Sequence, residues 1–398
     1  MAHRKIVLPA KGGPSGLIYS SPEVRCVPEA LPSHVVVRVL TTTVTYADLL
    51  IMSGSIDSKF PFPMTPGYDV IGVIEAVGSG VETGTGTGTG TETQAVLGAG
   101  TSLAVGDHVA SFCWLYQHGG CQEYVSLKAS DVVRLRDRPK DPVQAACLIM
   151  TGTTAFQALH RAGVPGAAPG SGTVLTKTGT LQPHMKVLIH GCAGGTGSML
   201  AVLCRLAGIP ADHVYGTCSR EKFSFVGPLG VGHPMDYKGD EDWATLAPAG
   251  GVDIVLDAIG GDYVDKSLRW LAPGGRYVSY GFTSSASPGL VSVPFVISHF
   301  AKIFWQQHVM WWWNRKQAVF FGGVTKKGET EGFRDDLLLL LELLDRGELC
   351  AAVGKVVPLS EVPAALQSIH DMKHVGKVVV VVDEALEQQE RLAGRISL

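Results

Sequence analysis

The stretch from residue 187 to residue 208 constrains the fold of this 398-residue chain more than any other. It begins with the apolar run Val187-Leu188-Ile189, which is typical of a buried parallel strand. A turn of small residues follows, and after it apolar residues recur at helical spacing. Strand, glycine turn and helix in this order form the first half of a nucleotide-binding unit, in which a pyrophosphate binds the free N–H groups at the helix start.

The turn departs from the usual G-x-G-x-x-G pattern, because a cysteine stands at the first glycine position. Glycine-rich turns also occur as plain tight connections, so the turn alone leaves both interpretations open. If it does bind a cofactor, the residues that contact the pyrophosphate are Cys192, Ala193, Gly194, Gly195, Thr196 and Gly197.

Composition excludes several classes of protein. A hydrophobic fraction of 45% with 17% charged residues is that of a globular enzyme rather than a disordered chain. The net charge of -3 offers no basic field for nucleic acid. The 8 cysteines include no C-x-x-C pair and are interpreted as reduced thiols. Neither a secretory signal nor a transmembrane segment stands out, so we expect a cytoplasmic protein.

The pattern of expected elements changes along the chain. Up to residue 125 short β-like pieces alternate with Gly and Pro, as in an all-β unit, whereas strands and helices alternate from 185 to 281, as in a doubly wound parallel sheet. A Gly/Thr tract at 84–94 and a second stretch at 163–183 are interpreted as loop insertions. A Leu-rich helix at 335–344, a strand at 376–382 and a frayed helix after Asp383 complete the prediction.

Nine motifs in order make the plan specific. The motifs are TYADLLIMSG (45–54), PGYDVIGVIEAVG (66–78), GDHVA (106–110), GGCQEYV (119–125), AACLIMTGTTAFQAL (145–159), HGCAGGTGS (190–198), GTCSREK (216–222), DAIGG (257–261) and GGRYVSYGF (274–282). Together they resemble the medium-chain dehydrogenase/reductase superfamily, and in particular its zinc-free quinone oxidoreductase branch.

The resemblance implies an α/β protein of two domains. A GroES-like, β-rich catalytic domain is expected over residues 1–149, with a C-terminal return at 323–398, and a Rossmann cofactor domain over 150–322. It also implies a homodimer, since the family places an edge strand that often pairs with a second subunit near 318–321.

The positions that hold catalytic zinc in alcohol dehydrogenases of this superfamily are occupied here by Thr45, Tyr68 and Met150. A hydroxyl, a phenol and a thioether are not a zinc ligand set, so no metal is expected. Without a Lewis acid to stabilise an alkoxide, alcohol oxidation is disfavoured. The remaining chemistry is hydride delivery to a quinone or an α,β-unsaturated carbonyl.

The second strand of the nucleotide unit points to NADPH. NAD-preferring enzymes carry an acid after this strand, and here Thr217 takes its position. A 2′-phosphate prefers hydroxyl donors and cations, which Ser219, Arg220 and Lys222 offer. Alternatively, the two cations only solvate a helix start. Further cofactor contacts implied by the resemblance are Tyr237, Thr154, Gly281 and Phe282.

The resemblance places the active site in the cleft between the domains, where Thr45, Tyr46 and Tyr68 are the catalytic candidates. Tyr68 either donates a proton to the substrate or fills the volume vacated by zinc, and both roles stay open. Asp48 is interpreted as a structural cap and not as a base. Thr45 stands where many quinone oxidoreductases have Asn, so no single relative's substrate carries over.

The Trp-rich passage at 304–321 allows burial at a subunit interface or over the substrate cleft, and alternatively contact with a membrane surface. The leading functional hypothesis is an NADPH-dependent, zinc-independent quinone or enone oxidoreductase. Its alternatives are an enoyl-thioester or alkenal double-bond reductase on the same fold, and a nucleotide-bound, membrane-associated adaptor without turnover.

Overall fold

The computed structural model describes residues 3–22, 26–81, 102–113, 118–162, 181–239, 242–281, 286–287, 290–291, 293–321 and 330–396. The Gly/Thr tract at 84–94, residues 163–180 of the second expected insertion and Phe282 lie outside the described residues. The chain folds into two compact units, of which the first comprises Met1–Ile149, Lys355–His374 and Val378–Leu398, and the second Met150–Gly354 and Val375–Lys377.

A six-stranded parallel sheet forms the centre of the second unit, in the order β10-β9-β8-β11-β12-β15. All four residues of β8 are buried, as the apolar run predicts for a strand covered on both faces. The strands are β8 (Val187–His190), β9 (Val214–Cys218), β10 (His233–Asp236), β11 (Val252–Asp257), β12 (Leu271–Ser279) and β15 (Gln317–Phe320).

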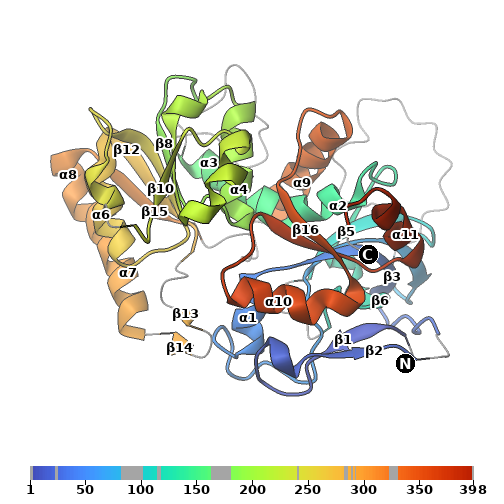
Figure 1. Ribbon diagram of the computed structural model, residues 1–398. Helices are drawn as coiled ribbons and strands as arrows, with labels where there is room; N and C mark the ends of the chain where they lie inside the picture. The colour runs from blue at the N-terminus through green and yellow to red at the C-terminus, as the bar shows by residue number, and fades with distance from the viewer. Residues whose placement is uncertain are drawn as a thin grey trace. The chain divides into compact units, whose positions relative to one another are not determined.

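Helices cover both faces of this sheet (Figure 1). On one face, α3 and α4 pack against each other and against β8, β11 and β12; on the other, α6 packs against β11, β12 and α7. These helices are α3 (Thr153–Ala162), α4 (Gly195–Leu206), α6 (Asp262–Trp270) and α7 (Val293–Trp305). The unit also contains α5 (Phe223–Val226), α8 (Trp311–Asn314), α9 (Thr330–Asp345) and a two-strand hairpin of β13 (Ala286–Ser287) and β14 (Leu290–Val291).

The first unit is built on an antiparallel sheet in the order β16-β17-β3-β4-β5-β7, with β6 paired to β3. Its strands are β3 (His34–Val44), β4 (Asp69–Val77), β5 (His108–Phe112), β6 (Tyr124–Lys128), β7 (Val132–Arg134), β16 (Val353–Pro358) and β17 (Lys377–Val381). A separate hairpin joins β1 (Lys5–Val7) to β2 (Ile18–Ser20). The helices are α1 (Tyr46–Met52), α2 (Pro142–Cys147), α10 (Val362–His370) and α11 (Glu384–Leu392).

The predicted α/β architecture, a GroES-like unit with a Rossmann unit, is confirmed. The expected C-terminal return differs, because the later segment of the first unit begins at Lys355 and not at residue 323. The cause is α9, which packs against α3 of the second unit. Gln157 on α3 donates a hydrogen bond to the buried Asp336 on α9, at 2.8 Å.

The tail after Asp383 forms the predicted helix, but the expectation that it frays is wrong. Asp383 caps α11 by accepting a hydrogen bond from the Leu386 N–H at 3.0 Å. Further along, Arg395 forms ion pairs with Asp141 at 2.7 Å and with Glu390 at 2.5 Å. The charged side chains of this segment form ion pairs and a helix cap, and they therefore hold α11 and Arg395 in place.

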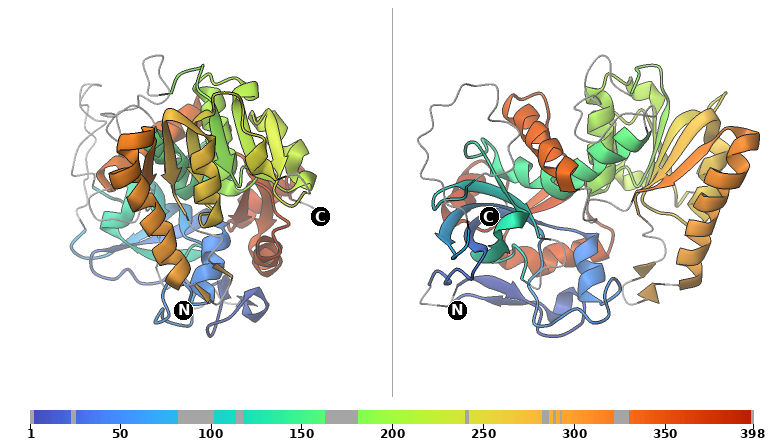
Figure 2. Two further views of the ribbon diagram at one scale, coloured as in Figure 1. Left: turned by 90° about the vertical axis from the view of Figure 1, so that its left-hand side faces the viewer. Right: turned by 180° about the vertical axis from the view of Figure 1, so that it is seen from behind.

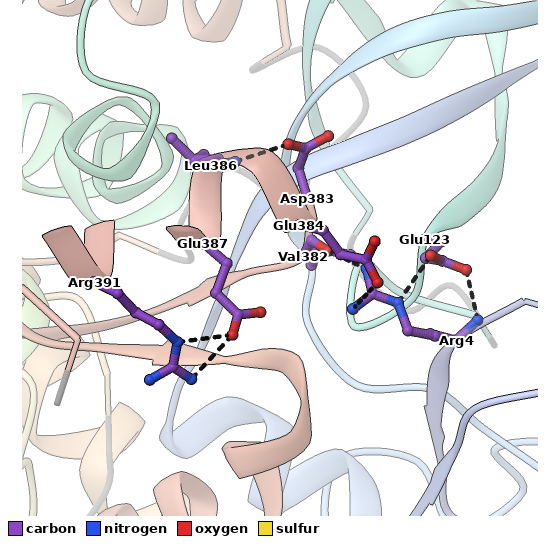
Figure 3. Close-up of polar contacts among 8 residues, drawn as sticks. All are labelled: Arg4, Glu123, Val382, Asp383, Glu384, Leu386, Glu387 and Arg391. Carbon is purple, nitrogen blue, oxygen red and sulfur yellow. Dashed lines mark hydrogen bonds and ion pairs between the residues drawn. The ribbon is translucent and has the colours of Figure 1, made fainter. Parts of the chain in front are cut away.

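The start of α11 also contacts the N-terminal segment through Arg4 (Figure 3). The guanidinium of Arg4 donates to Glu123 at 2.8 Å and to the Val382 carbonyl at 2.8 Å, and it lies 3.3 Å from Glu384. The Arg4 side chain is only 8% exposed, so these partners replace the water that it loses. We call Arg4, Glu123, Val382 and Glu384 the Arg4 cluster.

Candidate functional site

The predicted cofactor residues of the second unit lie at one edge of its sheet. The glycine turn follows β8, Ser219 follows β9, Tyr237 follows β10 and Gly281 comes shortly after β12. These strands are parallel and in adjacent register, so the residues that follow them emerge at the same carboxyl edge. This edge is where ligands bind in open α/β sheets.

The glycine turn is shaped by close backbone packing at Gly197. A Cβ atom at Gly197 would lie 2.2 Å from the Gly191 carbonyl oxygen, so only glycine allows this approach of α4 to the end of β8. The helix cap is Gly194, and no side chain caps it. The first turn of α4 can thus present its N–H groups to an anion.

Cys192, at the usual first-glycine position, directs its side chain into the core. It is fully buried, and a Cβ atom added to Gly216 of β9 would lie 2.6 Å from its sulfur. Contact with the Cys218 thiol, together with burial, raises the pKa of Cys192 well above its ordinary value. Its contribution to a nucleotide site can therefore come from the backbone and not from a thiolate.

Thr217, which stands at the position of the missing acid, is buried at the end of β9. Its hydroxyl is 3.0 Å from Nδ1 of His190 and accepts a hydrogen bond from the Gly191 N–H at 3.3 Å. His190 also contacts Ser267 at 2.8 Å, and burial lowers the pKa of His190 to about 4. Thr217 and His190 are thus buried, uncharged side chains, and Thr217 is hydrogen-bonded to the glycine turn at Gly191.

The cationic stretch after β9 starts with Ser219, which is buried. The Ser219 hydroxyl donates a hydrogen bond to Glu221, which is the first cause of the lowered pKa of that carboxyl group. Arg220 is exposed, and Lys222 is partly buried, with burial lowering its pKa. The backbone of Tyr237 lies beside the end of β9, because its N–H donates a hydrogen bond to the Cys218 carbonyl oxygen at 3.4 Å. Residues that carry two cations, one hydroxyl and one aromatic ring therefore follow the ends of the adjacent strands β9 and β10.

Two residues that lie at the glycine turn were not predicted from the sequence. Thr151 and Lys377 both lie against the start of α4, with side-chain atoms at 3.3 and 3.5 Å from the position of a Cβ atom on Gly195. Thr154, which was predicted, is buried on α3. The available signal for Lys377 was its place at the start of the apolar strand GKVVVVV, because lysine is rarely fully buried.

In the first unit the structure brings Thr45 and Tyr68 into contact. Thr45 follows β3 and Tyr68 precedes β4, and these antiparallel strands pair Thr43 with Asp69. The Thr45 hydroxyl and the Tyr68 phenol form a hydrogen bond. Register in the sheet, rather than nearness in sequence, creates this hydroxyl pair.

Asp48 holds the pair in place as a helix cap. Its carboxylate accepts the Thr45 N–H at 2.8 Å, while the Thr45 hydroxyl accepts the Ala47 N–H at 3.2 Å, which completes a capping box at the start of α1. The other Asp48 oxygen accepts the Gly67 N–H at 2.8 Å, next to Tyr68. The prediction that Asp48 is a structural cap is confirmed.

Tyr68 is buried and its ring packs edge-on against Phe112, with ring centroids 5.7 Å apart. Burial raises the pKa of Tyr68 well above its ordinary value, and the Asp48 and Asp69 carboxylates act in the same direction. The phenol therefore stays protonated and can donate a hydrogen bond. Tyr46, the first residue of α1, is half-buried, and burial raises the pKa of its phenol as well.

Neither hydroxyl is a donor that zinc prefers, and Met150 belongs to the second unit. Cys113 and Cys121 are buried, and burial raises the pKa of both thiols far above the usual value, which keeps them protonated. Within the described parts of the chain, no group of three or more His, Cys, Asp or Glu side chains could hold a metal ion.

Comparison with known protein families gives two matches, one in each half of the chain. Residues 31–137 match the family described as "Alcohol dehydrogenase GroES-like domain", and residues 229–380 match the family described as "Zinc-binding dehydrogenase". The "Synaptic vesicle membrane protein VAT-1 homolog" of Rattus norvegicus is 28% identical over 358 residues, or 88% of this chain and 77% of that protein. The "VAT-1 homolog-like" protein of Mus musculus is 27% identical over 389 residues, or 96% and 82%.

Solved structures share the fold over 96% of this chain. A quinone oxidoreductase from Coxiella burnetii superposes with a TM-score of 0.68 at 22% identity, covering 96% of this chain and 99% of the other. Mycobacterial Rv1454c complexed with NADPH gives 0.69 at 22%, and the CurK enoyl reductase gives 0.67 at 23%, each covering 96% of this chain and 100% of its own. Fold and site thus define a two-unit oxidoreductase of the nucleotide-binding class. The chain belongs to the medium-chain dehydrogenase/reductase superfamily.

Proposed function

We propose that this protein is an NADPH-dependent, zinc-independent oxidoreductase that reduces quinones or α,β-unsaturated carbonyls. The observation that carries the proposal is the hydrogen-bonded pair of the partly buried Thr45 hydroxyl and the buried Tyr68 phenol, at the two positions where the resemblance puts metal ligands in zinc enzymes of the superfamily. A neutral phenol cannot stabilise an alkoxide as a metal does, but it can hydrogen-bond a carbonyl or quinone oxygen. Such acceptors stabilise their own charge after reduction.

The residues of the second unit fit the cofactor. The first turn of α4 offers N–H groups to the diphosphate, while Ser219, Arg220 and Lys222 offer a hydroxyl and two cations to a 2′-phosphate. A bound NADPH would supply the hydride. We include Thr154, Tyr237 and Gly281 in the proposed cofactor site, and Thr45, Tyr46 and Tyr68 in the proposed substrate site.

Turnover by wild-type protein and by Tyr68→Phe tests this function. Wild type should oxidise NADPH in the presence of a quinone or an enal, and Tyr68→Phe should lower kcat about a hundredfold with unchanged affinity for NADPH, because only the proton donor is lost. Since the phenol stays protonated, wild-type kcat/KM should show no alkaline limb below about pH 10 that belongs to Tyr68.

The matched control is Tyr19→Phe, which removes an exposed phenol from β2 and should leave turnover intact. Full activity of Tyr68→Phe would reduce Tyr68 to a packing role. Activity with enals or enoyl thioesters but with no quinone would select the double-bond reductase. Oxidation of NADPH by no acceptor, in a protein that binds NADPH, would favour the adaptor.

A second candidate function, association with a membrane surface, is favoured by the outer face of α7 and α8. Six large apolar side chains are exposed there: Ile297, Phe300, Phe304, Trp305, Trp312 and Trp313. Trp312 and Trp313 are 75% and 84% exposed, and no Asp or Glu occurs from residue 293 to residue 320. Exposed aromatic rings beside basic residues suit the headgroup region of an anionic bilayer. Among the described residues no helix is long and apolar enough to cross a membrane.

Sedimentation with vesicles of phosphatidylcholine and phosphatidylserine tests the membrane proposal. The double variant Trp312→Ser/Trp313→Ser should lose most of the binding, about tenfold, because two interfacial anchors are removed. Leu392→Ser, at an equally exposed apolar residue of α11, is the control and should bind as wild type. We propose a homodimer through the edge strand β15, and a change of sedimentation coefficient in the Trp variant without loss of vesicle binding would assign the aromatic face to that subunit contact instead.

A further inference from the structure

Two cysteines lie next to each other where the glycine turn meets the end of β9. Cys192 belongs to the turn that follows β8, and Cys218 is the last residue of β9. The backbone contact between the two parallel strands continues past β8, because the Cys192 N–H donates a hydrogen bond to the Thr217 carbonyl oxygen at 3.1 Å. This bond brings Cys192 beside Cys218, although the two are distant in the sequence.

The Cys192 side chain reaches β9 over Gly216. A Cβ atom on Gly216 would lie 2.6 Å from the Cys192 sulfur and 2.9 Å from Cys192 Cβ, so the thiol occupies the space of the side chain that glycine lacks. The Cys192 S–H donates a hydrogen bond to the Cys218 sulfur. Both cysteines are free thiols, and Cys218 is 3% exposed. The fold thus holds two reduced sulfur atoms in contact.

The surroundings make the two thiols unequal. The hydrogen bond from Cys192 is the first cause of the lowered pKa of Cys218; burial opposes it, and the Lys222 ammonium lowers that pKa further. The same hydrogen bond, together with burial, raises the pKa of Cys192. Cys218 therefore has the thiolate character that reaction with a peroxide needs, whereas Cys192 keeps its proton.

We propose that Cys192 and Cys218 form a reversible disulfide when the protein meets a hydroperoxide, which makes the pair an oxidative modification site. In the first step the Cys218 sulfur attacks hydrogen peroxide: an S–O bond forms, the O–O bond breaks, and the leaving hydroxide takes up the proton that Cys218 released. In the second step the Cys192 sulfur attacks Cys218, the S–O bond breaks, and the hydroxyl leaves as water with the Cys192 proton. Two thiols are oxidised and one peroxide is reduced to water.

The effect of this bond on the cofactor rests on the proposed function. A disulfide holds its sulfur atoms closer than a hydrogen bond does, so it would pull the glycine turn towards the end of β9. The turn carries the proposed diphosphate site, and Arg220 and Lys222 of the proposed 2′-phosphate site directly follow β9. We therefore expect oxidation to raise the dissociation constant of NADPH about tenfold, within the usual range of coupling between two sites.

Peptide mapping without reductant tests the disulfide. Trypsin should release Cys192 in the peptide 187–205 and Cys218 in the peptide 206–220. Treatment with hydrogen peroxide should join these two peptides, and dithiothreitol should separate them again. Cys192→Ser should abolish the cross-link and leave a Cys218 sulfenic acid that dimedone traps. Cys204→Ser is the matched control, because Cys204 is a buried thiol on the same peptide as Cys192, and this variant should keep the cross-link.

The exposed thiols Cys26 and Cys350 are replaced by serine in every protein of this experiment, so that they form no competing bonds. Separate peptides after peroxide treatment would overturn the proposal, and so would a cross-link that persists in Cys192→Ser. Fragmentation of the joined peptides identifies the bonded cysteines in the protein that retains Cys192, Cys204 and Cys218, so the result does not depend on the folding of the Cys192 and Cys204 variants.

Fluorescence titration with NADPH, before and after peroxide treatment, measures the effect on the cofactor. The dissociation constant should rise about tenfold on oxidation when both cysteines are present and should not respond to peroxide in Cys218→Ser. A reduced protein that binds no NADPH would defeat the proposed function but not the disulfide, which the peptide map decides alone. A cross-linked protein that binds NADPH as tightly as the reduced protein would overturn the effect on the cofactor.

Discussion

Replacing Gly197 with alanine should abolish useful dinucleotide binding. The new Cβ atom would lie 2.2 Å from the Gly191 carbonyl oxygen and 2.9 Å from Cys192 Cα, which are backbone atoms that cannot move without distorting the turn. Overpacking of this kind costs about 1–3 kcal/mol. If the distortion falls on the diphosphate site, the dissociation constant of NADPH should rise about a hundredfold. Fluorescence titration with NADPH measures the change.

Gly227→Ala is the matched control for this experiment. Gly227 belongs to the same unit, has a φ of -55° and leaves open space around an added Cβ atom. The variant should bind NADPH as wild type does. If Gly197→Ala also binds NADPH with wild-type affinity, the turn after β8 is not the diphosphate site.

Removal of both cations beyond β9, in Arg220→Ala/Lys222→Ala, should erase a preference for NADPH. The dissociation constant of NADPH should rise roughly tenfold to a hundredfold, since a 2′-phosphate loses two charged partners, while that of NADH should not change. Titration of each protein with both dinucleotides gives the ratio directly.

Arg269→Ala, at an exposed arginine of α6, controls for the loss of positive charge from the unit and should leave both affinities unchanged. Equal affinity of the wild type for the two dinucleotides would contradict the assignment of NADPH. Glu221, which accepts the Ser219 hydroxyl, gives that outcome a physical cause, because its carboxylate competes for the donors that a phosphate would use.

The elements that could be predicted from sequence are those whose structure follows from the residue pattern within the element itself. The short apolar runs within β8 and β11 identify parallel strands, and the Leu-rich pattern identifies α9. The extent of the C-terminal return could not be predicted, because it depends on the packing of α9 against α3. The sequence near residue 323 contains no pattern that indicates the contact between α9 and α3.

The candidate site likewise contains residues that the local sequence predicts and residues that it does not. The glycine turn and the cations after β9 are contiguous in sequence, so their type and order indicate their chemistry. The engagement of Thr217 with His190 escaped prediction, because side-chain direction at a strand end depends on the neighbouring strand. Lys377 escaped for a similar reason, since only a bridge between β17 and the turn brings it there.

The Arg4 cluster has a consequence for handling the protein. It joins a residue near the first position, a residue beside β6 and the start of the last helix through one guanidinium. Figure 2 shows the first hairpin, in dark blue beside the N-terminus, near the lower edge of the ribbon, where trimming or a fusion partner would ordinarily be tried. Cutting away the residues around Arg4 would leave the Glu123 carboxylate buried without its counterpart, whereas removal of α11 would cost Arg4 only the more exposed Glu384 and leave the pair with Glu123 in place, so trimming is expected to be more harmful before β1 than at α11.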